Sequence, residues 1–203
     1  LLGDFGRTVL AAPDVRSAIR LFCDAFEVIQ SESVMSLDVH GDEAVVSYRI
    51  LNPRIWPRDQ DAEFTLGIIA TLIERAAGPS WRPLSVATEH VPHASMDSYS
   101  RQMRCALSHC ASENAIRFPA RALGLRIPDS DMDRFQDSAA GFVQTARDRR
   151  RALALAARVR TEIARHIGTG TCCEAEVARA LGLSERSLRR HLRQAEASYS
   201  DIL

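Results

Sequence analysis

Four arginines near the carboxyl end of the chain recur at spacings of three and four residues: Arg186, Arg189, Arg190 and Arg193. At about 100° per residue of an α-helix, all four fall within an arc of roughly 100°. A guanidinium keeps its charge and donates hydrogen bonds in a planar fork, which suits phosphate oxygens and the O6 and N7 atoms of guanine. The pattern therefore predicts an anion-binding helix face.

A helix, a short glycine turn and a second helix are predicted to position this face. Leu188 and Leu192 lie opposite the arginines on the helical wheel and can hold the second helix against a core. Gly182 can adopt the backbone angles that end the first helix, Leu183 can fill the turn, and Ser184 can cap the second helix. This order is the signature of a helix-turn-helix unit, whose second helix fits the major groove of DNA.

Two further helical stretches are predicted just before this turn. Thr171 and Glu174 are spaced as a capping box, which would begin the first helix of the pair. Its apolar positions are Val177, Ala178 and Leu181. An earlier helix is predicted to open at the arginine run 149–151 and to end at Gly168. Its core stripe is Leu155, Val159, Ile163 and Ile167.

Charge is unevenly distributed along the 203 residues. The 26 basic residues, all arginine, balance 26 acidic ones, which excludes a globally basic nucleic-acid coat and an acidic disordered tail. Residues 1–145 contain 14 arginines and 19 acidic residues, whereas residues 146–203 contain 12 and 7. Because the positive excess lies at the end with the arginine face, this end is expected to bind an anion. We place a domain boundary near residue 145.

Residues 1–145 are predicted to form an α+β domain. Helical spacing predicts helices at 15–29, 61–77 and 96–107. The predicted core stripe of the second is Phe64, Ile68, Ile69, Leu72 and Ile73. Alternation predicts strands at 35–39, 44–50, 84–88, 116–118 and 123–127, the first two joined by a hairpin at Gly41 and Asp42. Helices and strands interleave without a regular period, which favours α+β over a doubly wound sheet.

The sequence also resembles a known family, the AraC/XylS transcriptional regulators. Residues 177–203 are similar to the first helix-turn-helix of that family's DNA-binding domain. The upstream part is similar to the effector-binding domain of the branch that includes ornithine-responsive regulators. The residues that carry this second likeness are Leu2–Gly6, Ala12 and Pro13, Ala62–Phe64, Trp81–Pro83, His90 with Pro92, and Arg117 and Phe118.

The resemblance implies a domain plan and a set of site residues. Residues 1–145 would be an arabinose-binding-like effector domain, and residues 146–203 a helical, homeodomain-like DNA-binding segment with the first helix-turn-helix only. In the family, the positions matched by Arg186, Arg189 and Arg190 face bases, and the position matched by Arg193 lies near phosphate. The candidate DNA-binding residues are Ser184, Arg186, Ser187, Arg189, Arg190 and Arg193.

Two departures from the family pattern bear on this plan. Family members carry two helix-turn-helix units and extend upstream of the position matching Leu1, so we expect the chain to be a fragment. Ala197 stands where the family has a glycine, which affects the local turn rather than the groove helix. The implied partners are double-stranded DNA, a small organic effector, a second copy of the chain and RNA polymerase.

Other chemistries are less well supported by the residues. The group His90, His93, Cys105, His109 and Cys110 invites zinc, but its spacings match no closed structural-zinc pattern, so we expect neither metal nor cofactor. The acidic run Asp129, Asp131, Asp133 and Asp137 is interpreted as a solvated loop and helix start. No nucleophile with a base and an orienting group is evident, and we expect no enzyme activity.

The cysteines and apolar runs bear on location. The five cysteines, an odd number in a chain large enough to need no cross-links, predict no disulfides and a reducing cytosol. Cys172 and Cys173 are interpreted as cap and packing residues. No apolar run reaches a membrane span. The sequence predicts a cytoplasmic, effector-controlled DNA-binding regulator. The alternative is a small-molecule-binding or protein-interaction module whose helix-turn-helix remnant does not bind DNA.

Overall fold

The chain divides into two units, Leu1–Val143 and Gln144–Leu203. This computed structural model describes residues 2–51, 57–93, 96–166, 173–195 and 197–203. Within these ranges, none of the helices combines the length and the apolar character needed to cross a membrane.

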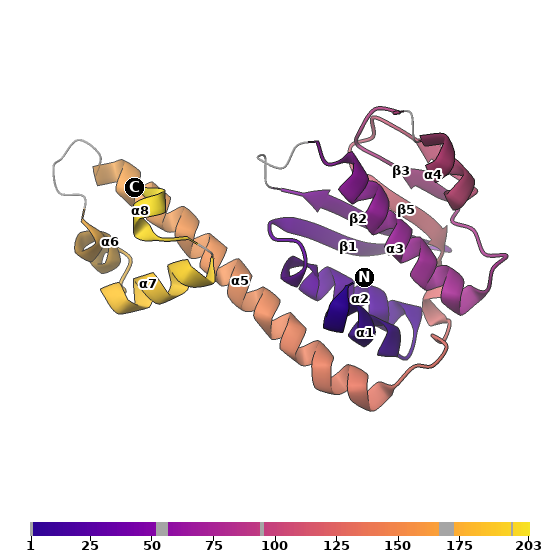
Figure 1. The fold of residues 1–203 in the computed structure, drawn as a ribbon, viewed down its shortest axis with the longest axis horizontal. Coiled ribbons are helices and arrows are strands. Elements are labelled where there is room, and N and C mark those ends of the chain that lie inside the picture. The colour runs from indigo at the N-terminus through magenta and orange to yellow at the C-terminus, as the bar shows by residue number, and fades with distance from the viewer. Residues whose placement is uncertain (1, 52–56, 94–95, 167–172, 196) are drawn as a thin grey trace. The chain divides into compact units, whose positions relative to one another are not determined.

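A five-stranded sheet forms the centre of the first unit (Figure 1). In spatial order its strands are β1 (Ser33–His40), β2 (Glu43–Ile50), β5 (Asn114–Pro119), β3 (Ser85–Ala87) and β4 (Ala106–Ser108). Neighbouring strands pair antiparallel except β3 and β4, which pair parallel. This mainly antiparallel sheet with its helices confirms the mixed class of fold predicted for this part of the chain.

The β1–β2 hairpin lies where the alternating pattern predicted it. His40 pairs with Glu43, and Gly41 in the turn has a φ of +59°, a conformation that costs glycine little. The pairing aligns Val46 with Ile116 of β5, and Val86 of β3 with the same residue. All three are buried, so one face of the sheet forms the core of the unit.

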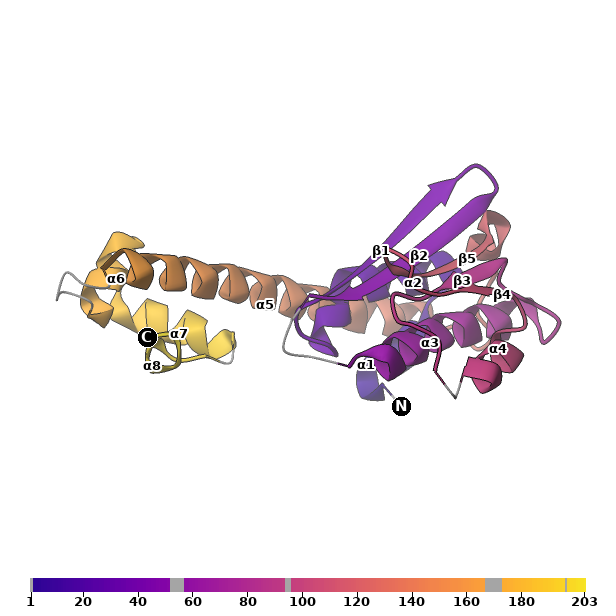
Figure 2. The same ribbon diagram turned by 90° about the horizontal axis from the view of Figure 1, so that it is seen from above.

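Helices cover this core face. The described helices of the unit are α1 (Gly3–Ala11), α2 (Val15–Ala25), α3 (Asp59–Ala77) and α4 (Met96–Met103), with 3₁₀ turns η1 (Phe26–Val28) and η2 (Ala120–Gly124). Figure 2 shows the helices gathered on one side of the sheet. Asp14 caps α2 by accepting a hydrogen bond from the Ser17 amide at 2.7 Å. Tyr48 of β2 donates to Asp61 of α3 at 2.5 Å, which ties sheet and helix together.

Two sequence-based expectations for this unit were wrong, and one helix was not predicted at all. Helix α1 was not predicted, although its Phe5 and Val9 are buried at helical spacing. The helix expected at 96–107 ends at Met103, because Arg104 adopts a φ of +53° and the chain then forms β4. The strand expected at 123–127 is mostly the η2 turn, with a single bridge between Arg126 and Asp14.

The core stripe predicted for α3 was also partly wrong. Leu66, Ile69 and Ile73 are buried, but Phe64 is 49% exposed and Ile68 is only half-buried. The helix is rotated so that Ala62, Thr65 and Leu66 face the sheet. Phe64 and Ile68 therefore stay on the side that faces away from the sheet core, where they line a cavity described below.

The described elements of the second unit are all helical. They are the later part of α5 (Met132–His166), α6 (Glu174–Ala180), α7 (Glu185–Gln194) and α8 (Tyr199–Ile202). Its buried core comprises Ala156, Val159, Ile163, Val177, Ala178, Leu188 and Leu192. Between α6 and α7, Gly182 has a φ of +70°, and the Leu183 amide donates to the Ala178 carbonyl at 2.9 Å. This closed turn ends one helix and starts the next.

Two predicted helix starts were wrong in this region. Helix α5 does not begin at the arginine run but 17 residues earlier, at Met132, because Asp131 caps it through the Arg134 amide at 3.0 Å. Helix α6 begins at Glu174 itself with Cys173 as its N-cap, which makes no side-chain bond, so Glu174 is not at the third helical position that a capping box requires. Ile167, Gly168, Thr171 and Cys172 lie outside the described residues.

Candidate functional site

A cavity of about 800 Å³ lies between helices α1, α3 and α4 of the first unit. Leu10, Phe64 and Ile68 give it apolar walls, and Gln60 and Gln102 add polar groups. This volume and mixture of walls are typical of pockets that hold small organic molecules. Sequence patterns did not identify the residues of this pocket, because its walls come from three helices that are about 20 to 50 residues apart along the chain.

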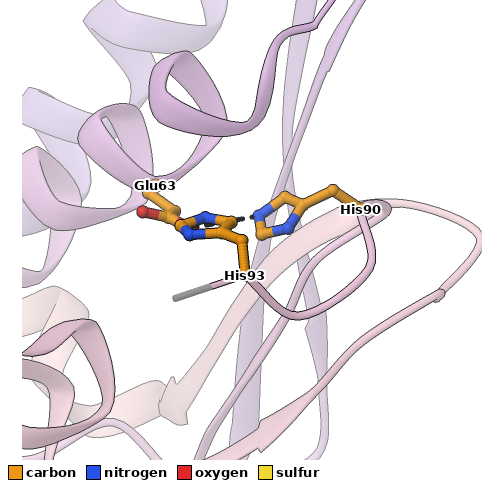
Figure 3. A group of neighbouring side chains, drawn as sticks. All are labelled: Glu63, His90 and His93. Carbon is orange, nitrogen blue, oxygen red and sulfur yellow. Dashed lines mark hydrogen bonds and ion pairs between the residues drawn. The ribbon is translucent and has the colours of Figure 1, made fainter. Parts of the chain in front are cut away.

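A carboxylate and two imidazoles meet beside this cavity (Figure 3). Glu63 comes from the first turns of α3, whereas His90 and His93 lie in the loop that follows β3. The Glu63 Oε1 atom is 3.3 Å from His90 Nε2 and 2.7 Å from His93 Nε2. The Glu63 and His90 side chains are 14% and 6% exposed, so the three groups interact largely out of solvent.

The loop that carries these histidines is held by its own hydrogen bonds. The Glu89 amide donates to Asn114 Oδ1 at 3.0 Å, and the Cys110 amide donates to the His90 carbonyl at 3.2 Å. Arg49 forms an ion pair with Glu89 at 2.9 Å. The position of His90 is therefore set by β2 and β5 rather than by the histidine cluster itself.

Two buried polar atoms near the cavity have no hydrogen-bond partner within the described residues: His90 Nε2 and the Tyr99 hydroxyl. His90 Nε2 lies 3.3 Å from the Glu63 carboxylate, but the geometry is not that of a hydrogen bond. Burial, together with the nearby Glu63 charge, raises the pKa of Tyr99 above its ordinary value. Buried polar groups usually have a hydrogen-bond partner, so two such atoms without one beside a cavity mark this place as a candidate binding site.

Sequence spacing did not identify this group. Of the five residues considered for zinc, the structure brings His90 and His93 together and adds Glu63, which was not considered for metal binding. Cys105 and Cys110 are not part of the group, and His109 instead makes a 2.9 Å contact with Thr88. Glu63 is 27 residues from His90 in sequence, and only the packing of α3 beside the loop after β3 brings them together.

The arginine face is presented by α7 in the second unit. Arg186, Arg190 and Arg193 are exposed, whereas Leu188 and Leu192 are buried on the opposite side. No ion pair involves these three arginines within the described part of the chain. The helix therefore directs three uncompensated cations to one side.

The other three predicted site residues are already engaged. Ser184 caps α7 by accepting from the Ser187 amide at 3.2 Å, and the two hydroxyls are 2.9 Å apart. Arg189 donates three hydrogen bonds to Glu174 of α6, at 2.8, 2.9 and 3.0 Å, and one to Glu185 at 3.2 Å. The Glu174 hydrogen bond and charge raise the pKa of the exposed Arg189 guanidinium. The glutamate predicted to cap a helix thus holds one of the four arginines.

The fold and these two sites define a class of protein: a sheet-and-helix domain with a ligand-sized cavity, in one chain with a small helical unit that exposes an arginine face. The family described as the arabinose-binding domain of AraC transcription regulators, N-terminal, matches residues 2–127. This match covers more than half of the chain, which therefore belongs to that family of AraC-type regulators. The resemblance noted in the sequence is confirmed at this level.

The fold is also similar to a solved structure, that of the transcriptional regulator CdpR from Pseudomonas aeruginosa. The TM-score is 0.55 at 18% sequence identity, over 99% of this chain. At this identity the similarity concerns the fold. The chain spans 65% of the length of that protein. No curated protein matches the sequence.

Proposed function

We propose that the chain is the effector-sensing and DNA-binding part of a transcription regulator. The observation that carries this proposal is the arginine face of α7, with Arg186, Arg190 and Arg193 exposed over buried Leu188 and Leu192. A recognition helix needs both features, because the leucines fix its orientation while the guanidiniums reach phosphates and base edges. The positive excess of residues 146–203 supports the same role.

The proposed division of labour within α7 follows the contacts of its side chains. Arg186 and Arg190 are proposed to face bases and Arg193 to face phosphate, whereas Ser184 and Ser187 secure the start of the helix. Arg189 is proposed to reach DNA only after exchanging Glu174 and Glu185 for a base or phosphate. This exchange trades one charged hydrogen bond for another, so Arg189 should contribute less to affinity than Arg186 or Arg190.

The test is binding of the full chain to a short labelled duplex over a range of salt concentrations. We expect Arg186→Ala and Arg190→Ala to weaken binding by ~1–3 kcal/mol each where they read a base, and Arg193→Ala to reduce the salt slope by about 0.9. Arg20→Ala, which removes an exposed arginine of α2 in the other unit, is the matched control. Unchanged binding by the double variant Arg186→Ala/Arg190→Ala would refute the DNA-binding role.

The cavity of the first unit is the proposed effector site. Its volume of about 800 Å³ fits a small organic molecule with an apolar body and a few polar groups. A thermal-shift screen of organic acids and amino acids against the full chain tests this. Any stabilising compound should lose its effect in Ile68→Trp, which narrows the cavity. The control is Val34→Trp, at an exposed apolar position on β1 away from the cavity. A hit that is indifferent to Ile68→Trp binds elsewhere.

The alternative function, a ligand-binding or protein-interaction module without DNA binding, is favoured by one observation. Arg189 is held by two glutamates and is less available than a base-reading arginine should be. The same salt titration distinguishes the two functions, since a module of this kind would show no affinity for the duplex even at low salt. The family likeness adds a homodimer and RNA polymerase as proposed partners, the first of which sedimentation measures directly.

A further inference from the structure

We propose that Glu63, His90 and His93 form a binding site for one divalent transition-metal ion of the zinc class. Two imidazoles and a carboxylate are a donor set that zinc accepts, with the remaining position left open. The three groups converge on one point, as Figure 3 shows, and their ligand atoms lie within 4.8 Å of one another. Nothing in the proposed sensing or DNA-binding roles requires this ion, so the inference stands apart from them.

The tautomer of His90 prepares its Nε2 atom for a metal. His90 Nδ1 lies 3.0 Å from the Val91 carbonyl oxygen, which can only accept, so Nδ1 carries the proton and donates. In the neutral ring, the Nε2 lone pair then points toward Glu63 Oε1 at 3.3 Å, so two hydrogen-bond acceptors, one of them negatively charged, face each other. A cation between the two atoms relieves this conflict. Histidines that bind metals usually show this pairing of one ring nitrogen with a backbone carbonyl.

The distances suit a tetrahedral ion with modest adjustment. Bond lengths of about 2.05 Å to zinc place neighbouring ligand atoms about 3.3 Å apart. The Glu63–His90 separation already has this value, whereas the 2.7 Å Glu63–His93 contact is a hydrogen bond that must open. The His93 Nε2 proton is released to solvent as the ion takes its place. The His93 side chain is 30% exposed, whereas the His90 backbone carbonyl is held by the Cys110 amide. The site is therefore half-formed before the ion arrives.

The proposed ion would lie beside the cavity, where it could bind an oxygen atom. Glu63 and Tyr99 both line the cavity, and the Tyr99 hydroxyl is buried without a hydrogen-bond partner among the described residues. The fourth position of the ion would point to this hydroxyl or to an oxygen atom of a molecule in the cavity. Zinc ions with three protein ligands commonly keep such an exchangeable position.

The experiment measures binding of zinc to the full chain after treatment with a chelator. A competing fluorescent zinc indicator should report one ion per chain for the unaltered protein. Loss of a residue that is only hydrogen-bonded to a metal ligand typically weakens metal binding roughly 10–100-fold. Glu63→Gln and His93→Gln each remove a ligand and should weaken zinc binding by more than this. His40→Gln, which removes an exposed histidine of β1, is the control and should bind zinc unchanged. Circular dichroism of each variant establishes that it is folded.

Cobalt supplies a second readout that does not depend on affinity. Bound Co²⁺ should give the visible absorption of a tetrahedral site without a thiolate charge-transfer band, because neither Cys105 nor Cys110 belongs to the group. Three results would overturn the proposal. The first is that the folded chain binds no zinc. The second is that folded Glu63→Gln and His93→Gln bind zinc as tightly as the unaltered protein. The third is a thiolate band, which would place a cysteine among the ligands.

Discussion

Leu188→Ala is expected to destabilise the second unit while leaving the stability of the first unchanged. Leu188 is fully buried on α7 and belongs to the same core as Val159 of α5 and Val177 of α6. Replacing a buried leucine by alanine costs about 2–5 kcal/mol, because a cavity adds to the lost apolar transfer. A unit of the size of Gln144–Leu203 has a total stability of roughly 3–9 kcal/mol. One substitution therefore removes a large part of what holds α7 in place.

The assay uses the position of the tryptophans. Both Trp56 and Trp81 lie in residues 1–143, so their fluorescence follows the first unit, whereas the far-ultraviolet circular dichroism also follows helices α5 to α7. In urea, Leu188→Ala should shift the early part of the dichroism transition to lower concentration and leave the tryptophan transition in place. Leu203→Ala, at an exposed residue of the same unit, should change neither.

The result that would refute this reasoning is a parallel shift of both signals. Helix α5 continues across the boundary between the units, and strong coupling through it would make the whole chain unfold as one. No shift at all would show instead that Leu188 does not carry the packing of α7.

Further perturbations probe individual groups. Glu174→Gln should release Arg189 and tighten binding to a duplex at low salt; unchanged affinity in the same titration would mean that Arg189 does not reach DNA. Tyr48→Phe should cost about 0.5–1.5 kcal/mol in a urea titration through the lost bond to Asp61. Burial raises the pKa of Cys23 to about 12, so iodoacetamide at neutral pH should modify exposed Cys110 well before Cys23, and mass spectrometry of the peptides would show the order. Burial and Asp61 also raise the pKa of Tyr48. As the pH rises, Cys23 and Tyr48 therefore lose their protons in the unfolded chain, near the ordinary pKa values of 9.0 and 10.0, before they do so in the folded one. The free energy of unfolding should fall above these pH values, and Tyr48→Phe should lessen that fall.

Local patterns in the sequence predicted the elements whose signals lie within a few residues. The Gly41 hairpin, the start of α2 at Val15 and the end of α3 at Ala77 were each predicted and lie where expected. Turns and caps depend on neighbouring residues, which is why the sequence defines them. Residues 106 and 107, in contrast, were wrongly predicted as helix. They form a strand because β3 offers them a partner about 20 residues away.

The arginine face was likewise predicted only in part from local sequence. Helical spacing placed the arginines of α7 on one side and its leucines on the other, and the burial of the leucines agrees with that pattern. The spacing carried no information about Arg189, because its partner Glu174 comes from another helix. A helical wheel describes one element, whereas an ion pair between elements depends on their packing.

The sequence by itself determined the family resemblance, the uneven charge and the arginine face of α7, because each depends on residues close together in the chain. Only the tertiary structure decided that Glu63 meets His90 and His93, and that Phe64 and Ile68 line a cavity rather than the core. The physical reason is rotation and packing: a small turn of α3 about its axis changes which side chains face the sheet, and short-range patterns do not fix that turn.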